Sequence, residues 1–360
     1  MDTCKAAVFI GAGKPLEVWD VPMQEVLPGA VLVRMEMAAI CGSDVSAWQK
    51  AETPHPMIFG HENIGTVAAL GEGPHRDVLG HGLEIGDRII FKKAACGRCY
   101  ECANGESCRA AEPYGYRPFR EPPHLRGGFG QYLYLDPGSF ILRVPDDMST
   151  ERALVAVIGN HTVNNGIERI GGIGLGSTVV VQGSGPIGLG ALVQTKAAGA
   201  QSVILIGAPR HRLELGMEMG ADATIDIEEH PRPEDRVGRV RELTGGRGAD
   251  VVIECSGAST AAREGLEMLR IGGRYLLVGL GQTPVDANVI VRKQLRVCGV
   301  TGASPGSIMR SVAAMHRTIT APVEKLITHH FPLERINEGF QAHHSLEATI
   351  AVVHPNGDSA

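Results

Sequence analysis

The sequence lacks the features that mark membrane, secreted or nucleic-acid-binding proteins. It has no run of eighteen apolar residues, and its start, Met1-Asp2-Thr3-Cys4-Lys5, leads into strand-like sequence rather than a cleavable apolar segment. It has no dense run of lysine and arginine, and its net charge of −6 offers no concentrated positive surface to phosphates. We therefore expect a cytoplasmic protein with small-molecule ligands and with no nucleic-acid or membrane partner.

The composition also lacks the bias of a disordered or repetitive chain. Hydrophobic residues make up 43% and charged residues 21%, which is an ordinary balance for a packed protein. The 47 glycines indicate many tight turns and close backbone approaches. Because 360 residues exceed the usual size of one domain, the length predicts two domains.

Cysteine is sparse except in one loop. Cys96, Cys99, Cys102 and Cys108 lie within thirteen residues and make up four of the eight cysteines. Four thiolates at these spacings can surround one Zn²⁺ tetrahedrally and fill every coordination position. A disulfide framework is the alternative, but the chain is long and the expected compartment is reducing. The loop therefore predicts a structural zinc that leaves no position for a substrate.

The two halves of the chain follow different patterns. The first half has short strands separated by glycine and proline, typical of a barrel-like β domain, and strands are expected at residues 30–37, 64–69, 88–91 and 131–135. The second half alternates helices with apolar runs that suit doubly buried strands. Its expected strands are residues 178–181, 203–206, 250–253 and 275–278, and its expected helices lie near residues 187–198, 212–219 and 260–269. A helix at 333–342 and a strand at 349–353 are expected to return to the first domain.

A glycine-rich segment follows the first strand of the second half. Gly183-Ser184-Gly185-Pro186-Ile187-Gly188 stands between that strand and an apolar helix, which is the context of a dinucleotide-binding fingerprint. Gly183 and Gly185 permit a tight turn and close approach of a pyrophosphate, and Gly188 lets the helix pack on the strand. The helix start, with Pro186 and Ile187, supplies NH groups and positive potential. A glycine-rich turn without a ligand is the alternative.

The next strand ends without the acid that usually binds the ribose 2′-hydroxyl of NAD. Gly207 leaves room there for a 2′-phosphate, and Arg210, with His211 or Arg212, would pair with it through charge-assisted hydrogen bonds. A solvent-facing Arg212 at a helix start is the alternative. We therefore favour NADP(H) over NAD(H).

A second group of metal-binding residue types lies outside the cysteine loop. Cys41-Gly42-Ser43-Asp44 ends a strand-like segment, and Gly60-His61-Glu62 follows nineteen residues later. A catalytic zinc needs about three protein ligands and one open position, where it polarises an alcohol or carbonyl oxygen. A lone cysteine or histidine is often a core residue, but the combination with the cysteine loop favours a catalytic zinc.

Together these motifs resemble the zinc-containing medium-chain dehydrogenase/reductase family over nearly the whole chain. The resemblance extends to the runs at residues 86–88, 127–129 and 254–257. It implies an α/β plus β fold in which a GroES-like catalytic domain, residues 1–161 completed by 303–360, accompanies a Rossmann domain with a doubly wound parallel sheet, residues 162–302. It also implies a nicotinamide cofactor in the cleft between them and reversible alcohol oxidation.

The resemblance gives roles to individual residues. Cys41 and His61 correspond to catalytic zinc ligands, and Glu62 to a carboxylate that coordinates directly or alternates with water. Ser43 corresponds to the hydroxyl that begins the proton relay. Because this chain has Ser46 where the family often has histidine, the outer relay is left to Asp44, solvent or the cofactor ribose.

Two further departures concern the metal sites. The family usually offers another ligand about two dozen residues before the glycine fingerprint, where this chain has Asn160-His161. Either His161 or, less well, Asn160 replaces it, or water completes the sphere; otherwise His161 lines the substrate or nicotinamide cleft. The gap from Cys102 to Cys108 holds five residues where seven are common, which still permits tetrahedral closure.

Substrate and assembly are read from two segments. Residues 113–126 hold three arginines and two tyrosines, and form either a contact for a polar, hydroxylated or anionic substrate or a solvated loop. We hypothesise a secondary alcohol or polyol, or the matching ketone. An NADPH-dependent carbonyl reductase without a normal catalytic zinc and an inactive cofactor-binding scaffold are the rival interpretations.

The apolar strand at 295–300 is expected at a sheet edge, where it would pair copies into a homodimer or homotetramer.

Overall fold

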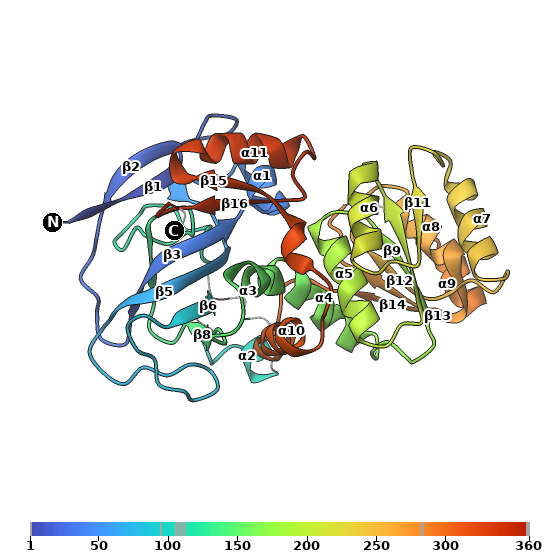
Figure 1. The fold of residues 1–360 in the computed structure, drawn as a ribbon, viewed down its shortest axis with the longest axis horizontal. Coiled ribbons are helices and arrows are strands. Elements are labelled where there is room, and N and C mark those ends of the chain that lie inside the picture. The colour runs from blue at the N-terminus through green and yellow to red at the C-terminus, as the bar shows by residue number, and fades with distance from the viewer. Residues whose placement is uncertain are drawn as a thin grey trace. The chain divides into compact units, whose positions relative to one another are not determined.

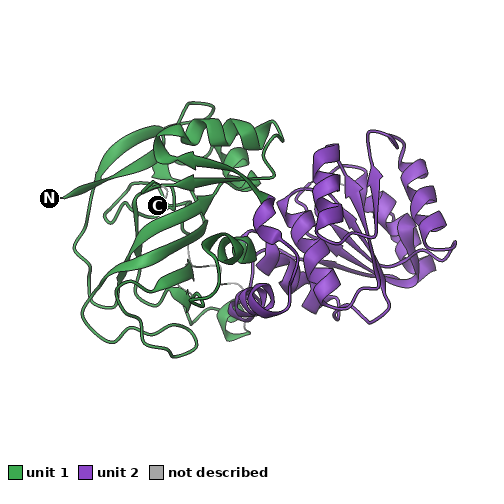
Figure 2. Cartoon of the chain, viewed as in Figure 1, with its two compact units in different colours: residues 1–157, 327–360 green, residues 158–326 purple. Residues whose placement is uncertain are grey.

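The chain divides into two compact units in a computed structural model that describes residues 2–93, 96–104, 108, 110, 113–281 and 284–357. Unit 1 comprises residues 1–157 and 327–360, and unit 2 comprises residues 158–326 (Figure 2). The return to unit 1 therefore comes at residue 327 rather than at the expected 303. The reason is α10 (Pro305–Arg317), which packs on α4 (Asn160–Arg169) of unit 2.

Unit 1 consists mainly of antiparallel strands in two sheets (Figure 1). The smaller sheet has the order β2-β1-β4, and the larger has the order β15-β16-β3-β5-β6-β8, with β7 also paired to β3. The strands are β1 (Thr3–Phe9), β2 (Glu17–Pro22), β3 (Val31–Ala39), β4 (Met57–Ile58), β5 (Glu62–Leu70), β6 (Arg88–Lys92), β7 (Tyr132–Leu135), β8 (Phe140–Arg143), β15 (Ile327–Pro332) and β16 (Ile350–His354). Each first-half strand expected from the sequence is present, within two residues at either end.

Short helices join these strands, and the C-terminal segment completes the unit. The helices are α1 (Gly42–Gln49), α2 (Tyr100–Ala103), α3 (Thr150–Val157), the 3₁₀ turn η2 (Leu333–Arg335) and α11 (Ile336–His344). The expected return is confirmed, because β16 pairs antiparallel with the end of β3 at Ala38 and Ala39. Fully buried aromatic rings fill the core beneath α11, namely Phe9, Phe59, Phe129 and Phe340. This packing fixes the end of β3, from which the candidate active site begins.

Unit 2 is a parallel sheet with helices between successive strands (Figure 1). The strands are β9 (Thr178–Gln182), β10 (Ser202–Gly207), β11 (Ala223–Asp226), β12 (Ala249–Glu254), β13 (Leu269–Leu277) and β14 (Arg296–Gly299). The helices, besides α4 and α10, are α5 (Pro186–Ala197), α6 (Arg210–Glu218), α7 (Pro233–Leu243), α8 (Ala261–Met268), α9 (Ala287–Lys293) and the 3₁₀ turn η1 (Val323–Leu326).

The strand order of unit 2 determines where a ligand can bind. The order β11-β10-β9-β12-β13-β14 is that of a doubly wound sheet, in which the chain direction across the sheet reverses between β9 and β12. Ligands of such sheets bind at the carboxyl ends of the strands beside this reversal. The glycine fingerprint begins there, at Gly183, and the strand β14 lies at the sheet edge, as the sequence predicts.

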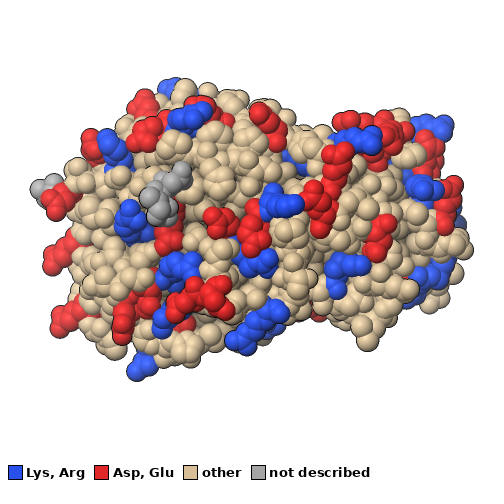
Figure 3. Space-filling model, viewed as in Figure 1, with Lys and Arg blue, Asp and Glu red and all other residues tan. Residues whose placement is uncertain are grey.

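The surface gives two further observations. Basic and acidic side chains are interspersed on the face drawn in Figure 3, so that this face carries no field of a single sign. Among the described helices, none combines the length and the apolar character that crossing a membrane requires.

Candidate active site and metal centres

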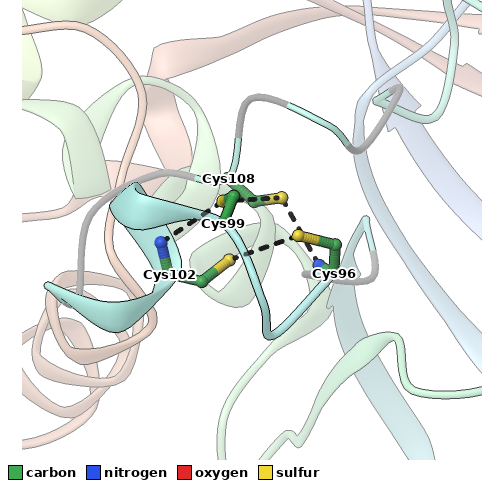
Figure 4. A group of neighbouring side chains, drawn as sticks. All are labelled: Cys96, Cys99, Cys102 and Cys108. Carbon is green, nitrogen blue, oxygen red and sulfur yellow. Dashed lines mark hydrogen bonds between the residues drawn. The ribbon is translucent and has the colours of Figure 1, made fainter.

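The thiols of the cysteine loop converge on one point (Figure 4). Cys96 Sγ lies 3.9 Å from Cys102 Sγ, and Cys99 Sγ lies 3.9 Å from Cys108 Sγ. A tetrahedral zinc with Zn–S bonds of about 2.3 Å places its sulfur ligands about 3.8 Å apart. The four thiols therefore fit one closed zinc site, and the short gap before Cys108 does not prevent it.

Local backbone geometry produces this arrangement. Cys99 caps the start of α2 and its sulfur accepts from the amide of Cys102 at 3.4 Å, while Cys108 Sγ accepts from the amide of Cys96 at 3.4 Å. The amide of Cys96 lowers the pKa of Cys108, whereas the neighbouring Cys99 sulfur raises the pKa of Cys102. The thiols thus compete to hold protons and charge, and a divalent cation between them would relieve that competition.

The second group of ligand types, Cys41, His61 and Glu62, meets because of strand register. β3 and β5 run antiparallel with Ala39 opposite Glu62, which brings Cys41, two residues after β3, near His61 and Glu62 at the start of β5. One donor atom from each of Cys41, His61 and Glu62 lies within 4.8 Å of the others. A thiolate, an imidazole and a carboxylate at these distances match the three-ligand set of a catalytic zinc.

Asp44 holds the imidazole of this group in one orientation. Its side chain is fully buried, and it accepts from the amide of Cys41 at 3.0 Å and from His61 Nδ1 at 3.1 Å. Nδ1 donates to this carboxylate, so Nε2 is the nitrogen left for a metal, which would displace any proton held there. Burial alone would lower the pKa of His61, but the charge of Asp44 and the Cys41 thiol outweigh it and raise the pKa well above its usual value. Asp44 is thus a support for His61, enclosed in the protein.

The sequence reasoning missed Lys92, which the structure places at this group. Its Nζ donates to the carbonyl of His61 at 3.1 Å. Burial lowers the pKa of Lys92, and the charges of Glu62 and Cys41 act in the opposite direction. A partly buried ammonium thus lies beside the negative charge of the ligands, and no motif in the sequence marks it.

Ser43 and Tyr116 complete the group. Ser43 Oγ lies 3.4 Å from His61 Nε2, so the proposed relay hydroxyl stands beside the atom that would face a metal. The hydroxyl of Tyr116 donates to Ser43 Oγ at 2.9 Å and approaches Asp44 Oδ1 at 3.3 Å. The sequence placed Tyr116 only within a loop expected either to contact a substrate or to be solvated, and its contact with Ser43 arises from tertiary packing.

Of the other expected contact residues of that loop, Arg120 is exposed, and the remaining three are engaged elsewhere in unit 1. Arg117 and Arg126 both donate to Asp136. Tyr114 is buried and its hydroxyl bonds to Ser139 Oγ at 2.7 Å. The segment is therefore anchored by its own ion pairs rather than solvated throughout.

The candidate further ligands, Asn160 and His161, belong to unit 2, whereas Cys41, His61 and Glu62 belong to unit 1. Asn160 begins α4 and packs on α5, since a Cβ at Gly190 would lie 2.5 Å from Asn160 Oδ1. His161 is buried within α4. The three donors of unit 1 match a catalytic ligand set without either residue.

A different physical constraint accounts for each glycine of the fingerprint in unit 2. Gly183 has φ +111° and a Cβ there would lie 3.0 Å from the amide of Ser256, so the turn after β9 requires glycine. A Cβ at Gly188 would lie 1.8 Å from the carbonyl of Gly183, so helix α5 packs directly on that turn. A Cβ at Gly185, which precedes Pro186, meets no atom within 4 Å. That open position at a helix N-terminus fits a pyrophosphate.

The residues proposed for a 2′-phosphate differ in environment. A Cβ at Gly207 would lie 2.4 Å from Ser184 Oγ, so packing against the fingerprint already requires glycine there. Arg210 is exposed and makes long contacts of 3.4 Å with Glu214 and Glu229. Arg212 is buried, and burial lowers its pKa. The expected solvent-facing alternative for Arg212 is therefore wrong, because α6 turns that side chain inward.

Comparison with known proteins identifies the family. A family model described as "Alcohol dehydrogenase GroES-like domain" matches residues 27–146, and one described as "Zinc-binding dehydrogenase" matches residues 186–317. The 5-exo-hydroxycamphor dehydrogenase of Pseudomonas putida is 31% identical over 95% of this chain and 96% of its own. The chain belongs to the zinc-binding alcohol dehydrogenase family. An L-threonine 3-dehydrogenase of Bacillus subtilis is 34% identical over 89% of this chain and 90% of its own.

A solved structure supports the same assignment. An alcohol dehydrogenase of Thermotoga maritima superimposes with a TM-score of 0.92 and 32% identity, over 98% of this chain and 100% of that chain. The expected combination of a GroES-like domain with a doubly wound parallel sheet is thereby confirmed. The protein is an oxidoreductase of the dehydrogenase type that acts on alcohols.

Proposed function

We propose that the protein transfers hydride between a nicotinamide cofactor and a secondary alcohol or polyol, or the matching ketone, with one catalytic and one structural zinc. The observation that carries the proposal is the group of Cys41, His61 and Glu62 donor atoms within 4.8 Å of one another. Ser43 Oγ, a hydroxyl able to take and give a proton, stands 3.4 Å from His61 Nε2 beside this group. The four-cysteine loop would hold the structural ion.

Each residue of the group has a defined task. Cys41, His61 and Glu62 would hold the catalytic zinc, which supplies Lewis-acid polarisation of the substrate oxygen when bound. Asp44 keeps the hydrogen on His61 Nδ1 and so keeps Nε2 available. In oxidation Ser43 would accept the proton of the alcohol while its own hydrogen passes outward to solvent or the cofactor ribose, and in reduction the same transfers would run in reverse.

The substrate class rests on two relatives and on chemistry. The relatives' names specify 5-exo-hydroxycamphor and carbon 3 of L-threonine, and each of these positions carries a secondary hydroxyl. A secondary alcohol is therefore the class we propose for this chain. The result that would overturn it is a panel in which small primary alcohols are oxidised far better than secondary and polyhydroxylated ones.

The cofactor proposal is NADP(H) in preference to NAD(H). No acid ends β10, and the exposed Arg210 lies at the start of α6, where its long contacts with Glu214 and Glu229 can rearrange at little cost. Arg210→Gln should raise KM for NADPH several-fold and leave KM for NADH unchanged. Arg239→Gln, at an exposed helical arginine paired with Glu242, is the matched control. Equal kcat/KM for NADH and NADPH in the unaltered enzyme would contradict the preference.

Metal analysis tests the two-zinc proposal against the rival reductase without a catalytic zinc. The purified protein should contain two zinc ions per chain, and Cys41→Ala should contain one. One zinc in the unaltered protein, together with undiminished ketone reduction, would favour the rival. No ketone or alcohol turnover with either cofactor, despite two zinc ions, would favour the scaffold.

We also propose that copies of the chain associate through β14, whose outer edge is free of strand partners among the described residues. The measured mass in solution should be that of a dimer or tetramer. A proline at Val297, within β14, should shift it toward the monomer if this edge pairs the copies.

A further inference from the structure

We propose that Tyr116 is a positioning residue that directs the hydroxyl group of Ser43 toward the reacting oxygen of the substrate. The inference rests on the proposed function, because that function places the substrate oxygen at Ser43. Its starting observation is the hydrogen bond of 2.9 Å from the Tyr116 hydroxyl to Ser43 Oγ.

The hydrogen-bonding capacity of Ser43 shows which of its positions remains open to the substrate. A serine hydroxyl has one hydrogen and two acceptor positions. Tyr116 fills one acceptor position, and the nearby His61 Nε2 is the atom that a metal would take, so it would cease to accept from Ser43. In reduction Ser43 then gives its hydrogen to the ketone oxygen and regains one from solvent, and in oxidation it accepts the alcohol's proton at its second acceptor position while its own hydrogen passes to solvent.

Tyr116 is suited to donate a hydrogen bond to Ser43. A tyrosine hydroxyl carries one hydrogen, and here it donates that hydrogen to Ser43 Oγ at 2.9 Å. The ring centroid of Tyr116 lies 5.3 Å from that of His61 and 6.3 Å from that of Phe59, and these contacts limit its rotation. The hydroxyl is therefore held between Ser43 and Asp44, to which it also points at 3.3 Å.

The backbone fixes Tyr116 beside His61. Gly115 has φ +84°, and a Cβ there would lie 2.7 Å from the carbonyl of Gly60, so residues 115–116 pass directly over residues 60–61. Further along the loop, the amide of Phe119 donates to the carbonyl of Pro56 at 2.8 Å. Two close backbone contacts thus hold the loop in place, and the position of Tyr116 is built into the fold of unit 1.

The first test compares Tyr116→Phe with Tyr114→Phe in the zinc-loaded, full-length enzyme. The substrate is the best secondary alcohol of the panel, with saturating cofactor. Tyr116→Phe should lower kcat by about ten- to a hundredfold and leave KM nearly unchanged, because proton transfer through Ser43 contributes to the chemical step and not to binding. Tyr114→Phe removes a hydroxyl two residues away that bonds to Ser139, and should lower thermal stability without lowering kcat. Equal losses of kcat in the two variants would overturn the proposal.

A double-mutant cycle shows whether Tyr116 acts through Ser43. Ser43→Ala should lower kcat at least as much as Tyr116→Phe, and the double variant should match Ser43→Ala, since the partner of Tyr116 is already gone. Effects that multiply across the two sites would overturn the proposal.

A structural readout separates this inference from the proposed function. In crystals of the zinc-loaded proteins, Ser43 Oγ should keep its orientation beside His61 in the unaltered enzyme and rotate in Tyr116→Phe. An unchanged Ser43 in the variant would overturn the role of Tyr116 even if the enzyme is active. If the unaltered enzyme oxidised no alcohol, the proposed function would fail, and the rotation of Ser43 would still decide whether Tyr116 positions it.

Discussion

The two metal-ligand groups of unit 1 are assembled in opposite ways. The cysteine loop draws its four sulfurs from thirteen consecutive residues, and its supporting hydrogen bonds come from amides of the same loop. The group of Cys41, His61 and Glu62 comes from two strands, and its supports come from α1, β6 and the loop at 113–126. One site is local in sequence and the other is a product of the whole unit.

This difference teaches what each site can tolerate. If the closed site loses its metal, the fold of the cysteine loop should suffer. The chemical step should not, because the substrate does not bind at that metal. The open site depends on the orientation of its ligand and relay side chains. Asp44, which contacts His61, and Tyr116, which contacts Ser43, therefore affect function although neither is a metal ligand. The following predictions address this contrast in order of decreasing effect.

Loss of a ligand at the open site should remove activity and preserve the fold. Cys41→Ala should lower kcat/KM by more than about a thousandfold, because the several kcal/mol of charge stabilisation from the metal is lost. Circular dichroism and the melting temperature should stay close to those of the unaltered protein. Retained alcohol oxidation would show that Cys41 holds no catalytic metal.

Loss of a ligand in the cysteine loop should have the opposite signature. Cys102→Ser should release the structural zinc and lower the free energy of unfolding by about 3 to 5 kcal/mol, because loss of a metal is among the few causes of unusually large single-substitution effects. The fraction that stays folded should keep its kcat. Denaturant unfolding with zinc analysis measures both, and a loss of kcat at unchanged stability would reverse the roles of the two sites.

The same contrast explains what could be predicted from the sequence. The spacing of the four loop cysteines is enough to predict that their sulfurs lie close together. The fingerprint at residues 183–188 is recognised because a strand precedes it and a helix follows it. These local signals predicted the clustering of the four thiols and the turn between β9 and α5.

The remaining features depend on contacts between distant residues. Lys92 and Tyr116 reach His61 through the register of β5 with β6 and through the passage of Gly115 over Gly60, and neither contact has a sequence period or motif. Likewise, the end of unit 2 at residue 326 follows from the packing of α10 on α4, which strand and helix patterns alone do not reveal.

Weakening a support of the open site should lower metal affinity there and not in the loop. Asp44→Asn keeps the size of the side chain but weakens its hold on His61 Nδ1, so zinc affinity at Cys41 and His61 should fall about 10- to 100-fold. Chelator competition should then remove the zinc at Cys41 and His61 at a lower chelator concentration than in the unaltered protein. The zinc of the cysteine loop should leave at the same concentration in both proteins. Early release of both ions would show that the two sites are not independent.

Unit 2 extends the comparison to a region stabilised by charge, with neither metal-ligand group in it. Asp250 at the start of β12 accepts from Arg247, from Arg270 and from the amide of Thr178 at 2.9 Å. Burial acts to raise its pKa, but these hydrogen bonds outweigh burial and lower the pKa to about 2. A lowered pKa stabilises the folded state above the unfolded value near 4, and that contribution, about 2 kcal/mol, is lost as the pH falls from about 4 to 2.

Asp250→Asn should therefore lower the free energy of unfolding by about 2 kcal/mol at neutral pH and flatten the acid dependence between pH 4 and 2, with zinc content unchanged. Asp235→Asn, at a partly exposed carboxylate paired with the exposed Arg232, is the matched control and should shift the unfolding midpoint little, because water screens that pair. Urea unfolding at pH 7 and pH 3 measures both variants. If the stability of Asp250→Asn kept its full dependence on pH, carboxylates other than Asp250 would have to account for it. The contrast between a loop stabilised by metal and a strand stabilised by charge at its start would then fail.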